Sequence, residues 1–379
     1  MEVKRRSRLT DSHAIPENWE YKPLSYFVTY TNGKAHEQSI ADFGPYVVVN
    51  SKFISTGGEV KKYSNQCFCP AAAGDVLMVM SDVPNGRAIA KCFLTDDETK
   101  YTVNQRICIL QPRNIDGRLL YYKLDRNPYY LAFDDGAKQT NLRKNDVLSC
   151  PLAIPVCREE QHAIASALGD VDALLGSLER LIAKKRDLKQ AAMQQLLTGQ
   201  TRLPGFHGEW EVKHLGVVLK VRHGKSQHDV VSNDGRYPIL ASGGEIGRTN
   251  EYLYDKPSVM IGRKGTIDSP QYVDTPFWTV DTLFFTEMQV GVHAKFVFYK
   301  FLLIPWRNYN EASGVPSLNA RTIESIEAVF PSFAEQIAIA AVLTDMDAEL
   351  TALEQRLAKT RDLKQGMMQE LLTGRTRLI

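Results

Sequence analysis

EQHAIASALGDVDALLGSLERLIAKKRDLKQAAMQQLLTGQTRL, at residues 160–203, decides the fold because it returns at residues 335–378 as EQIAIAAVLTDMDAELTALEQRLAKTRDLKQGMMQELLTGRTRL. The two copies are identical at 28 of 44 aligned positions, without a gap and at a constant offset of 175. Identity at that level over that length indicates an internal duplication rather than a shared helical composition. We therefore expect two half-molecules in tandem.

Each copy is predicted to form one long helix, because apolar residues recur at alternating spacings of three and four. These residues are Leu168, Val171, Leu175, Leu178 and Ile182 in the first copy and Leu343, Met346, Leu350, Leu353 and Leu357 in the second. Ser332 and Glu335 have the spacing of a capping box, and Gly199 and Gly374 suit left-handed C-terminal caps. A helix of roughly 40 residues is about 60 Å long.

The apolar stripe of each helix is narrow, which favours coiled-coil packing over burial against a domain. We expect the two copies to pair with each other as an antiparallel coiled coil. The alternative is that each helix lies on its own domain as an ordinary surface helix.

Composition places the rest of the chain among globular proteins of two or three domains: 379 residues with a formal net charge of +2. The N-terminus has no apolar segment of the signal-peptide type, and the most apolar stretch, 296–306, is interrupted by Lys300. We therefore expect neither export nor membrane insertion. The cysteines lack zinc-site spacing and are expected to be reduced thiols of a cytoplasmic protein. They are Cys67, Cys69, Cys92, Cys108, Cys150 and Cys157.

The segments between the helices contain short aromatic and β-branched runs bounded by Gly, Pro, Asn and Asp, which predicts strands. The runs are 46–50, 76–80, 101–110, 237–240, 258–261 and 279–285, and short helices are expected at 119–124 and 295–303. The predicted fold class is α+β, with two globular domains at 1–155 and 204–331 and two long helical segments at 156–203 and 332–379.

The two globular segments match each other faintly. Trp19, Gly33 and Lys34 correspond to Trp210, Gly224 and Lys225 at an offset of 191, and residues 136–141 match 314–319 at an offset of 178. A helix kept alike in both copies suggests a shared task, such as packing or binding two copies of one partner. Domains that diverged suggest two different targets.

At this point the sequence resembles the specificity (S) subunit of type I restriction-modification enzymes over nearly its whole length. The motifs are Pro-Glu-Asn-Trp at 16–19, Tyr-Pro-Ile-Leu-Ala-Ser-Gly-Gly at 237–244, Ile-Gly-Arg-Lys-Gly-Thr at 261–266 and Gly-Val-Pro-Ser-Leu-Asn at 314–319. Arg-Asp-Leu-Lys-Gln and Leu-Leu-Thr-Gly close each helix at 186–199 and 361–374. Each motif alone is weak, whereas their order together with the duplicated helix is specific.

The resemblance implies a non-catalytic subunit that reads a split, asymmetric DNA sequence, one half-site per target-recognition domain. It also implies two modification (methyltransferase) subunits as partners, with a restriction (translocase-nuclease) subunit added for cutting. S-adenosylmethionine, Mg and ATP would be bound by those partners, and no cofactor or metal is expected in this chain. Two readers on a helical spacer would hold the half-sites a set distance apart.

Base reading needs side chains that present paired hydrogen bonds, and phosphate contacts need cationic or backbone donors. The candidates in the first domain are Lys34, Arg87, Lys138, Gln139, Asn141 and Arg143. The matching positions in the second are Lys225, Arg263, Lys264, Ser317, Asn319 and Arg321. At residues 81–87 the first domain departs from the Arg-Lys-Gly pattern of the family, which weakens the match of Arg87.

The ends of the two helices are candidates for holding the modification subunits, because their identity exceeds what a coiled-coil seam requires. The alternative is that packing alone preserved them. The residues are Arg186, Lys189, Gln190, Leu196, Leu197 and Arg202, and Arg361, Lys364, Gln365, Leu371, Leu372 and Arg377.

The sequence allows two rival functions. An enzyme is disfavoured because the chain has neither a Pro-Pro dipeptide, as in the catalytic loop of amino-methyltransferases, nor a phosphate-binding G-x-x-x-x-G-K-[ST] loop. The glycines of 243–247 are expected to form a turn. A coiled-coil scaffold joining two protein-binding modules would share the helices but would not bind DNA, so salt-dependent DNA affinity separates it from a DNA reader.

Overall fold

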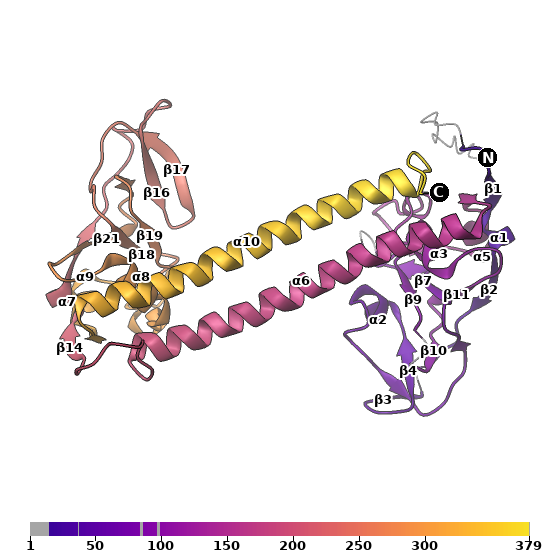
Figure 1. Ribbon diagram of the computed structural model, residues 1–379, viewed down its shortest axis with the longest axis horizontal. Coiled ribbons are helices and arrows are strands. Elements are labelled where there is room, and N and C mark those ends of the chain that lie inside the picture. The colour runs from indigo at the N-terminus through magenta and orange to yellow at the C-terminus, as the bar shows by residue number, and fades with distance from the viewer. Residues whose placement is uncertain (1–14, 37, 84–85, 97–98, 379) are drawn as a thin grey trace. The chain divides into compact units, whose positions relative to one another are not determined.

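The computed structural model describes residues 15–36, 38–83, 86–96 and 99–378. The chain divides into two compact units, coloured in chain order in Figure 1. Unit 1 comprises Met1–Ser177 and Leu357–Ile379, and unit 2 comprises Leu178–Arg356. Each unit therefore contains one globular domain, the N-terminal half of one long helix and the C-terminal half of the other.

The domain of unit 1 is built on a four-stranded sheet in the order β2-β11-β7-β9 and a five-stranded sheet in the order β3-β5-β4-β10-β6. The first has strands Val28–Asn32, Ile107–Pro112, Val76–Val79 and Cys92–Leu94, and the second Ile40–Ala41, Tyr63–Ser64, Tyr46–Val49, Tyr101–Val103 and Pro70–Ala71. Two strand pairs complete it: β1 (Trp19–Pro23) with β13 (Pro151–Pro155), and β8 (Ser81–Asp82) with β12 (Thr140–Asn141). The short helices are α1 (Leu24–Phe27), α2 (Ser51–Ser55), α3 (Gly117–Leu124), α4 (Pro128–Leu131) and α5 (Lys144–Leu148).

The domain of unit 2 repeats this plan. Its four-stranded sheet has the order β15-β21-β18-β19, with strands Leu219–His223, Leu283–Met288, Ser258–Gly262 and Gln271–Val273. A three-stranded sheet joins β17 (Gly244–Thr249), β16 (Tyr237–Ala241) and β20 (Trp278–Thr279), and β14 (Glu211–His214) pairs with β22 (Glu327–Phe330). Its short helices are α7 (Leu215–Val218), α8 (Ala294–Leu303), η1 (Trp306–Tyr309) and α9 (Ala320–Ser325).

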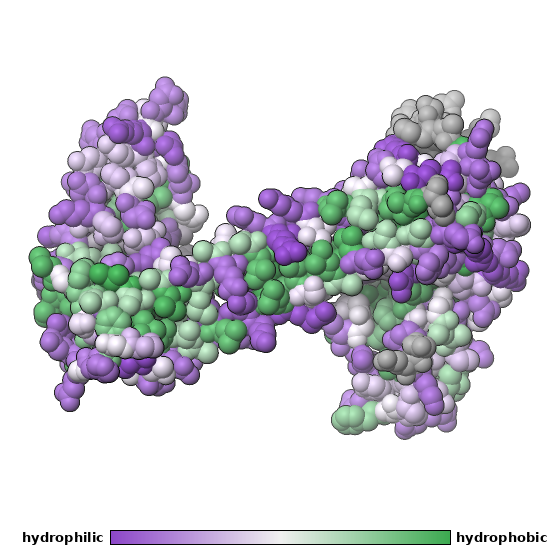
Figure 2. Space-filling model, in the orientation of Figure 1, coloured by the Kyte–Doolittle hydropathy of each residue, from purple (hydrophilic) through white to green (hydrophobic). Residues whose placement is uncertain are grey.

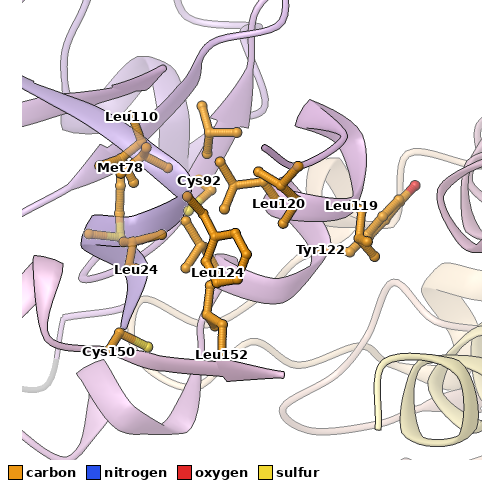
Figure 3. Packing of buried hydrophobic residues seen from close by; sticks show 14 of the residues in the cluster. Leu24, Met78, Cys92, Leu110, Leu119, Leu120, Tyr122, Leu124, Cys150 and Leu152 are labelled. Carbon is orange, nitrogen blue, oxygen red and sulfur yellow. The ribbon is translucent and has the colours of Figure 1, made fainter. Parts of the chain in front are cut away.

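The core of unit 1 lies between the four-stranded sheet, helix α3 and the ends of both long helices. Figure 3 shows Met78 and Leu110 of the sheet, Leu120 and Leu124 of α3, and Leu152 of β13 among its packed residues. Ile164 and Leu168 from the start of one long helix and Leu371 from the end of the other are buried in the same cluster. In unit 2, Leu197 and Leu343 join the domain core in the same way. Each domain is thus fixed to both long helices by apolar burial.

The long helices are α6 (Arg158–Thr198) and α10 (Phe333–Leu371), 41 and 39 residues in length. The predicted left-handed caps are confirmed, because Gly199 and Gly374 both have φ of +75°. The capping box is confirmed only in part. The Glu335 backbone N–H donates to Ser332 Oγ at 3.3 Å, but the Glu335 carboxylate accepts from Arg202 instead of turning back to the cap.

The antiparallel pairing of the helices is confirmed within each unit. In unit 1, Asp172 of α6 pairs with Lys364 of α10 at 2.6 Å. In unit 2, Lys189 pairs with Asp347, at the repeat-equivalent positions. Leu178, Ile182 and Leu350 are buried, whereas the remaining predicted seam residues between them are partly exposed, as in a two-helix coil. No helix among the described residues is long and apolar enough to span a membrane.

Most predicted elements are present, but two predicted strands are each divided in two. Residues 101–110 form β10 and β11, separated by a turn in which the Ile107 N–H donates to Asn104 O at 2.9 Å. Residues 279–285 likewise divide into β20 and β21, with the Leu283 N–H donating to Val280 O at 3.1 Å. At both turns the chain passes from one sheet to the other. The sequence pattern did not indicate this change because the apolar run continues through the turn. Residues 243–247 are also only partly a turn, because Gly244 already begins β17.

The structure confirms one of the two offsets between the domains and corrects the other. The backbone N–H of Gly33 donates to Ile107 O at 2.9 Å, and that of Gly224 donates to Leu283 O at 3.0 Å. Both acceptors are the first residue of the adjacent strand, β11 or β21, as the offset of 191 predicts. For the later segment the equivalent residues are Leu142 and Leu318. Their backbone N–H groups donate to Met80 O at 2.8 Å and to Arg263 O at 3.0 Å. The offset there is 176, so the match of 136–141 with 314–319 at 178 was wrong by two residues.

Candidate nucleic-acid interface

The candidates of unit 1 gather at one end of its four-stranded sheet. In register, Asn32 of β2 and Val79 of β7 lie beside Cys108 and Ile107, at the start of β11. Lys34 therefore emerges next to the 104–106 turn, and its N–H donates to Val103 O at 2.9 Å. Strand β8 emerges from the same end, because the Met80 N–H donates to Arg106 O at 2.9 Å.

The remaining candidates of unit 1 are brought to this end by strand β12, which pairs with β8. Gln139 and Asn141 lie on or beside β12, and all of the predicted residues around it are exposed, namely Lys138, Gln139, Asn141 and Arg143. Arg87 is also exposed, and the next residue is held to β8 by Asp82, whose carboxylate accepts from the Ala88 N–H at 2.6 Å.

Unit 2 repeats the arrangement with different side chains. His223 of β15 and Gly262 of β18 lie beside Phe284 and Leu283 at the start of β21. Lys225 follows β15 and is held by a bond from its N–H to Thr279 O at 2.9 Å. Lys264 forms a bridge with Ser317, in the place of the β8–β12 pair.

Two other candidates of unit 2, Arg263 and Asn319, already form hydrogen bonds to backbone groups. Arg263 Nη1 donates to Asp281 O at 3.3 Å, so the guanidinium is held against the turn before β21. Asn319 is the N-cap of α9, and its Oδ1 accepts from the Arg321 N–H at 2.9 Å. The cap uses one of the two lone pairs of this oxygen and fixes the orientation of the Asn319 amide.

The corrected offset also changes the equivalences. Met80, not Arg87, stands where Arg263 stands in unit 2, so the doubtful match of Arg87 is not supported. Ser81 corresponds to Lys264 and Asn141 to Ser317. Gly262 is required by packing, because a Cβ at this position would lie 2.0 Å from Thr266 O. At Gly265 a Cβ would meet no atom within 4 Å, but the backbone φ of +81° favours glycine.

This surface lies at the end of each sheet that is remote from the long helices. At the other end of unit 1, beyond β11, Arg158 Nη2 of α6 donates to Arg113 O at 3.2 Å. In unit 2 the His293 N–H, beyond β21, donates to Gln336 Oε1 of α10 at 3.0 Å. The helices therefore anchor one end of each sheet and leave the other free for a ligand.

Sequence reasoning missed two residues of this surface, Ser81 and Arg106. Ser81 lies within the segment that departs from the pattern of the second domain, and its side chain contacts both Gln139 and Asn141. Arg106 is exposed in the turn that divides β10 from β11, which was predicted as continuous strand. The departure from the second domain could have indicated Ser81, but no sequence signal indicated the turn.

The residues predicted to bind partners are mostly used inside the units. Leu197 is fully buried, Leu196 and Leu371 are buried, and Leu372 is half-buried. Five of the basic residues form ion pairs, which are Arg186 with Glu354, Lys189 with Asp347, Lys364 with Asp172, Arg202 with Glu335 and Arg377 with Glu160. These contacts give the conserved helix-end residues a packing role within each unit. Arg186, Gln190, Arg361 and Gln365 are exposed.

A lysine of each domain reaches the end of a long helix. Lys123 Nζ donates to Leu372 O and Ala153 O, both at 2.5 Å, and lies 4.8 Å from the ring centre of Trp19. Lys300 Nζ donates to Leu197 O at 2.8 Å and lies 5.6 Å from the Trp210 ring. Burial lowers the pKa of Lys123 to about 7 and that of Lys300 to about 8. Unpaired carbonyls at a helix end are stabilised by such donors.

A groove opens beside each of these helix ends. In unit 1 it has a volume of about 590 Å³ and is lined by Leu152, Gln365, Met368 and Leu372 among others. In unit 2 its counterpart of about 360 Å³ is lined by Leu197, Leu303, Pro305 and Ala328 among others. The duplication has thus produced an equivalent hollow twice.

Comparison with known proteins relates this chain to one family. A family model described as the type I restriction modification DNA specificity domain matches residues 16–185 and 207–360. The putative type I restriction enzyme MjaX specificity subunit of Methanocaldococcus jannaschii is 24% identical over 416 residues, covering 97% of this chain and 96% of that relative. The type I restriction enzyme EcoDI specificity subunit of Escherichia coli is 22% identical over 167 residues, covering 44% of this chain but only 37% of the relative.

Two solved structures share the fold. The S subunit of a type I restriction-modification system from M. genitalium superposes with a TM-score of 0.67 at 18% identity, covering 93% of this chain and 96% of that one. The HsdS subunit from Thermoanaerobacter tengcongensis gives 0.50 at 15% identity, covering 96% and 99%. The likeness extends over both units and both long helices.

Proposed function

The chain belongs to the family of type I restriction-modification DNA specificity domains, and we propose that it reads a split, asymmetric DNA target, with one half-site bound by each unit. The observation that carries this proposal is the contrast between the two ends of each domain. At the end that contacts the long helices, the two units have the same contacts at equivalent positions. At the free end they present different polar side chains on the same backbone frame.

That contrast is what a bipartite reader requires. A common anchor keeps both reading surfaces in the same relation to their helices, while different side chains allow the half-sites to differ in sequence. In unit 1 the free end carries Lys34, Gln139 and Asn141, and in unit 2 it carries Lys225, Lys264 and Ser317. Cations beside amide or hydroxyl groups suit phosphate binding together with base-edge reading.

The partners in this proposal are two modification (methyltransferase) subunits and, when present, restriction subunits. The repetition of each helix end, with its groove, supports two copies of one partner. Leu181 and Leu188 of α6 are 39% and 49% exposed and lie one heptad apart. Figure 2 shows apolar patches among the polar ones on the long helices. Such a surface suits a helix of a partner subunit.

The chain itself would supply recognition rather than catalysis. S-adenosylmethionine, Mg and ATP would then be bound by the modification and restriction subunits. A cytoplasmic location follows from this role, because the DNA to be modified is there.

The first test is methylation mapping by single-molecule sequencing, in a host that expresses this chain with its cognate modification subunit and in a host lacking this chain. A new split motif with methyladenine on both strands supports the proposal and gives both half-sites and the spacer. An assembled complex that adds no motif, and whose DNA affinity does not fall with added salt, would favour the scaffold instead.

The partner surface is tested separately by charge reversal at Arg186 and Arg361 together. Both side chains are exposed, and Arg186 pairs with Glu354 at 2.5 Å. Loss of co-purification with the modification subunit, with an unchanged melting temperature, would support a docking role. Unchanged co-purification would show that these helix positions are preserved by packing alone.

A further inference from the structure

Three polar side chains on the β8–β12 pair of unit 1 form a closed hydrogen-bonded cluster. Ser81 Oγ donates to Asn141 Oδ1 at 2.7 Å. Gln139 Nε2 donates to Ser81 Oγ at 2.8 Å and to Asn141 Oδ1 at 3.3 Å. Gln139 and Asn141 are exposed, so the order of this cluster comes from its own hydrogen bonds rather than from burial.

The cluster determines which atoms face outward. An amide oxygen has two lone pairs and an amide nitrogen two hydrogens. Inside the cluster Asn141 Oδ1 accepts from two donors and Gln139 Nε2 donates to two acceptors. The groups outside these contacts include one acceptor, Gln139 Oε1, beside two donors on Asn141 Nδ2. Turning the Asn141 amide over by itself would set its nitrogen against the Gln139 nitrogen. Turning both amides over reverses the network and leaves Asn141 Oδ1 as the acceptor beside donors on Gln139 Nε2, so in either arrangement the pair presents an acceptor beside donors.

We propose that Gln139 and Asn141, held in place by Ser81, read an adenine in the half-site bound by unit 1. In the major groove adenine presents the N6 amino donor beside the N7 acceptor. Gln139 Oε1 would accept from N6 and Asn141 Nδ2 would donate to N7. Guanine presents two acceptors, and its O6 would face Gln139 Oε1 without a hydrogen between them. The inference rests on the proposed function, because it requires unit 1 to bind DNA by this surface.

The surroundings fit this assignment. The cluster lies at the free end of the sheet, where β8 emerges beside the turn that also holds Lys34. Lys138 and Arg143 flank it along the chain and are exposed. Phosphate contacts from such cations would fix the register of the duplex, and the amide pair would then supply the sequence information.

Unit 2 provides an internal contrast at the same strand pair. Lys264 stands in the place of Ser81 and Ser317 in the place of Asn141. By the same offset, Val315 takes the place of Gln139, so this pair has no amide cluster. We therefore expect no adenine requirement from this position of unit 2.

The test is enrichment of a randomised duplex library by the full chain in complex with its modification subunits. The wild-type complex should select one position of one half-site as adenine. Asn141→Asp replaces the donors with acceptors, so discrimination in favour of adenine at that position should fall roughly 10- to 100-fold. Cytosine, whose N4 amino group donates, should gain at the same position. The other half-site should be unchanged.

Two further variants separate reading from positioning and from folding. Ser81→Ala removes the residue that orients the amides, so it should weaken the adenine preference while leaving affinity for unrelated DNA and its salt dependence unchanged. Lys138→Gln, the matched control, should weaken binding to all sequences alike. Replacing the selected adenine by 7-deazaadenine should weaken wild-type binding but not binding by Asn141→Asp, because only the wild type uses N7.

The outcomes distinguish this inference from the proposed function. If the wild type selects a split motif but Asn141→Asp, with an unchanged melting temperature, selects the same motif, the adenine assignment is wrong and DNA reading stands. If the wild type selects no motif and its binding is insensitive to salt, both proposals fail.

Discussion

Arg377 donates hydrogen bonds to both carboxylate oxygens of Glu160, a residue 217 positions away whose side chain is only 1% exposed. Arg202 makes the same two bonds to Glu335 in unit 2, at the repeat-equivalent positions. In each unit the end of one long helix is therefore fixed to the start of the other by a bidentate ion pair. The duplicated sequence preserved both partners of this contact.

This reciprocity predicts the result of exchanging the charges. Arg377→Glu alone should destabilise unit 1, because it places a carboxylate beside the buried Glu160. Combining it with Glu160→Arg should recover part of the loss, and the same exchange at Arg202 and Glu335 should behave alike in unit 2. Thermal unfolding of the two single variants and the double variant gives the coupling. Additive losses would contradict a direct pair.

The two copies of the Leu-Leu-Thr-Gly motif should differ in their sensitivity to truncation. Leu197 is fully buried in the core of unit 2, whereas its equivalent in unit 1, Leu372, is only half-buried. Leu197→Ala should therefore cost about 2–5 kcal/mol of unfolding free energy. Leu372→Ala is the matched control and should cost less, as measured by urea unfolding of both variants. Equal costs would mean that the packing of the two ends is the same.

Burial of Lys123 should give unit 1 a distinctive pH dependence. Its folded-state pKa is lowered by burial to about 7 from 10.5. The unfolded chain therefore holds a proton that the folded chain releases between these values, so stability rises with pH across this window and falls back as pH approaches 7. The slope is at most about 1.4 kcal/mol per pH unit.

The measurement compares the unfolding free energy of the wild type with that of Lys123→Met at pH 7.5, 8.5 and 9.5. The methionine cannot titrate, so the difference should shift in favour of the wild type as pH rises. Lys300→Met should behave similarly in unit 2, where burial lowers the lysine pKa to about 8. A difference that does not change with pH would show that Lys123 stays protonated, stabilised by its two carbonyl acceptors.

The repeat made the architecture predictable from sequence. A period of 175 residues with helical spacing indicated two long helices, and their narrow stripe indicated antiparallel pairing, which the Asp172–Lys364 pair shows. The first part of each domain was also aligned correctly, because Gly33 and Gly224 need the same close approach to a backbone oxygen. These features depend on local pattern and on the duplication alone.

The candidate surface at the free end of each sheet was predictable only in part. Sequence reasoning selected Gln139 and Asn141 by residue type, but it missed Ser81, whose contact with both depends on a pairing 60 residues apart in the chain. It also matched the second half of the domains two residues out of register, because the glycine of each segment lies in a loop of different length. Loop lengths and long-range pairings are set by tertiary packing, which neither periodicity nor composition reveals.

The close approach at Gly33 predicts a coupling between packing and DNA binding. An added Cβ would lie 2.0 Å from Asn104 O, so Gly33→Ala should force the chain apart at a cost of about 1–3 kcal/mol and displace the adjacent Lys34. Gly314→Ala is the control, because a Cβ there meets nothing within 4 Å. Melting temperature and DNA affinity should both fall for Gly33→Ala and stay unchanged for the control. A displaced Lys34 with undiminished affinity would remove it from the interface.

The salt dependence of DNA binding should identify which cations contact phosphate. Each phosphate neutralised by a lysine contributes about 0.9 to the slope of log affinity against log salt concentration on duplex DNA. Lys264 and Lys225 are exposed at the free end of the unit 2 sheet, so Lys264→Gln and Lys225→Gln should each lower that slope by about 1 if they bind phosphate. If Lys264 instead reads a guanine edge, its replacement should relax one base position of the motif as well.

Lys359, exposed on α10, is the control, and Lys359→Gln should leave slope and motif unchanged. Titrations at several salt concentrations with a cognate and a scrambled duplex distinguish these roles, because a phosphate contact weakens both duplexes equally and a base contact weakens only the cognate one.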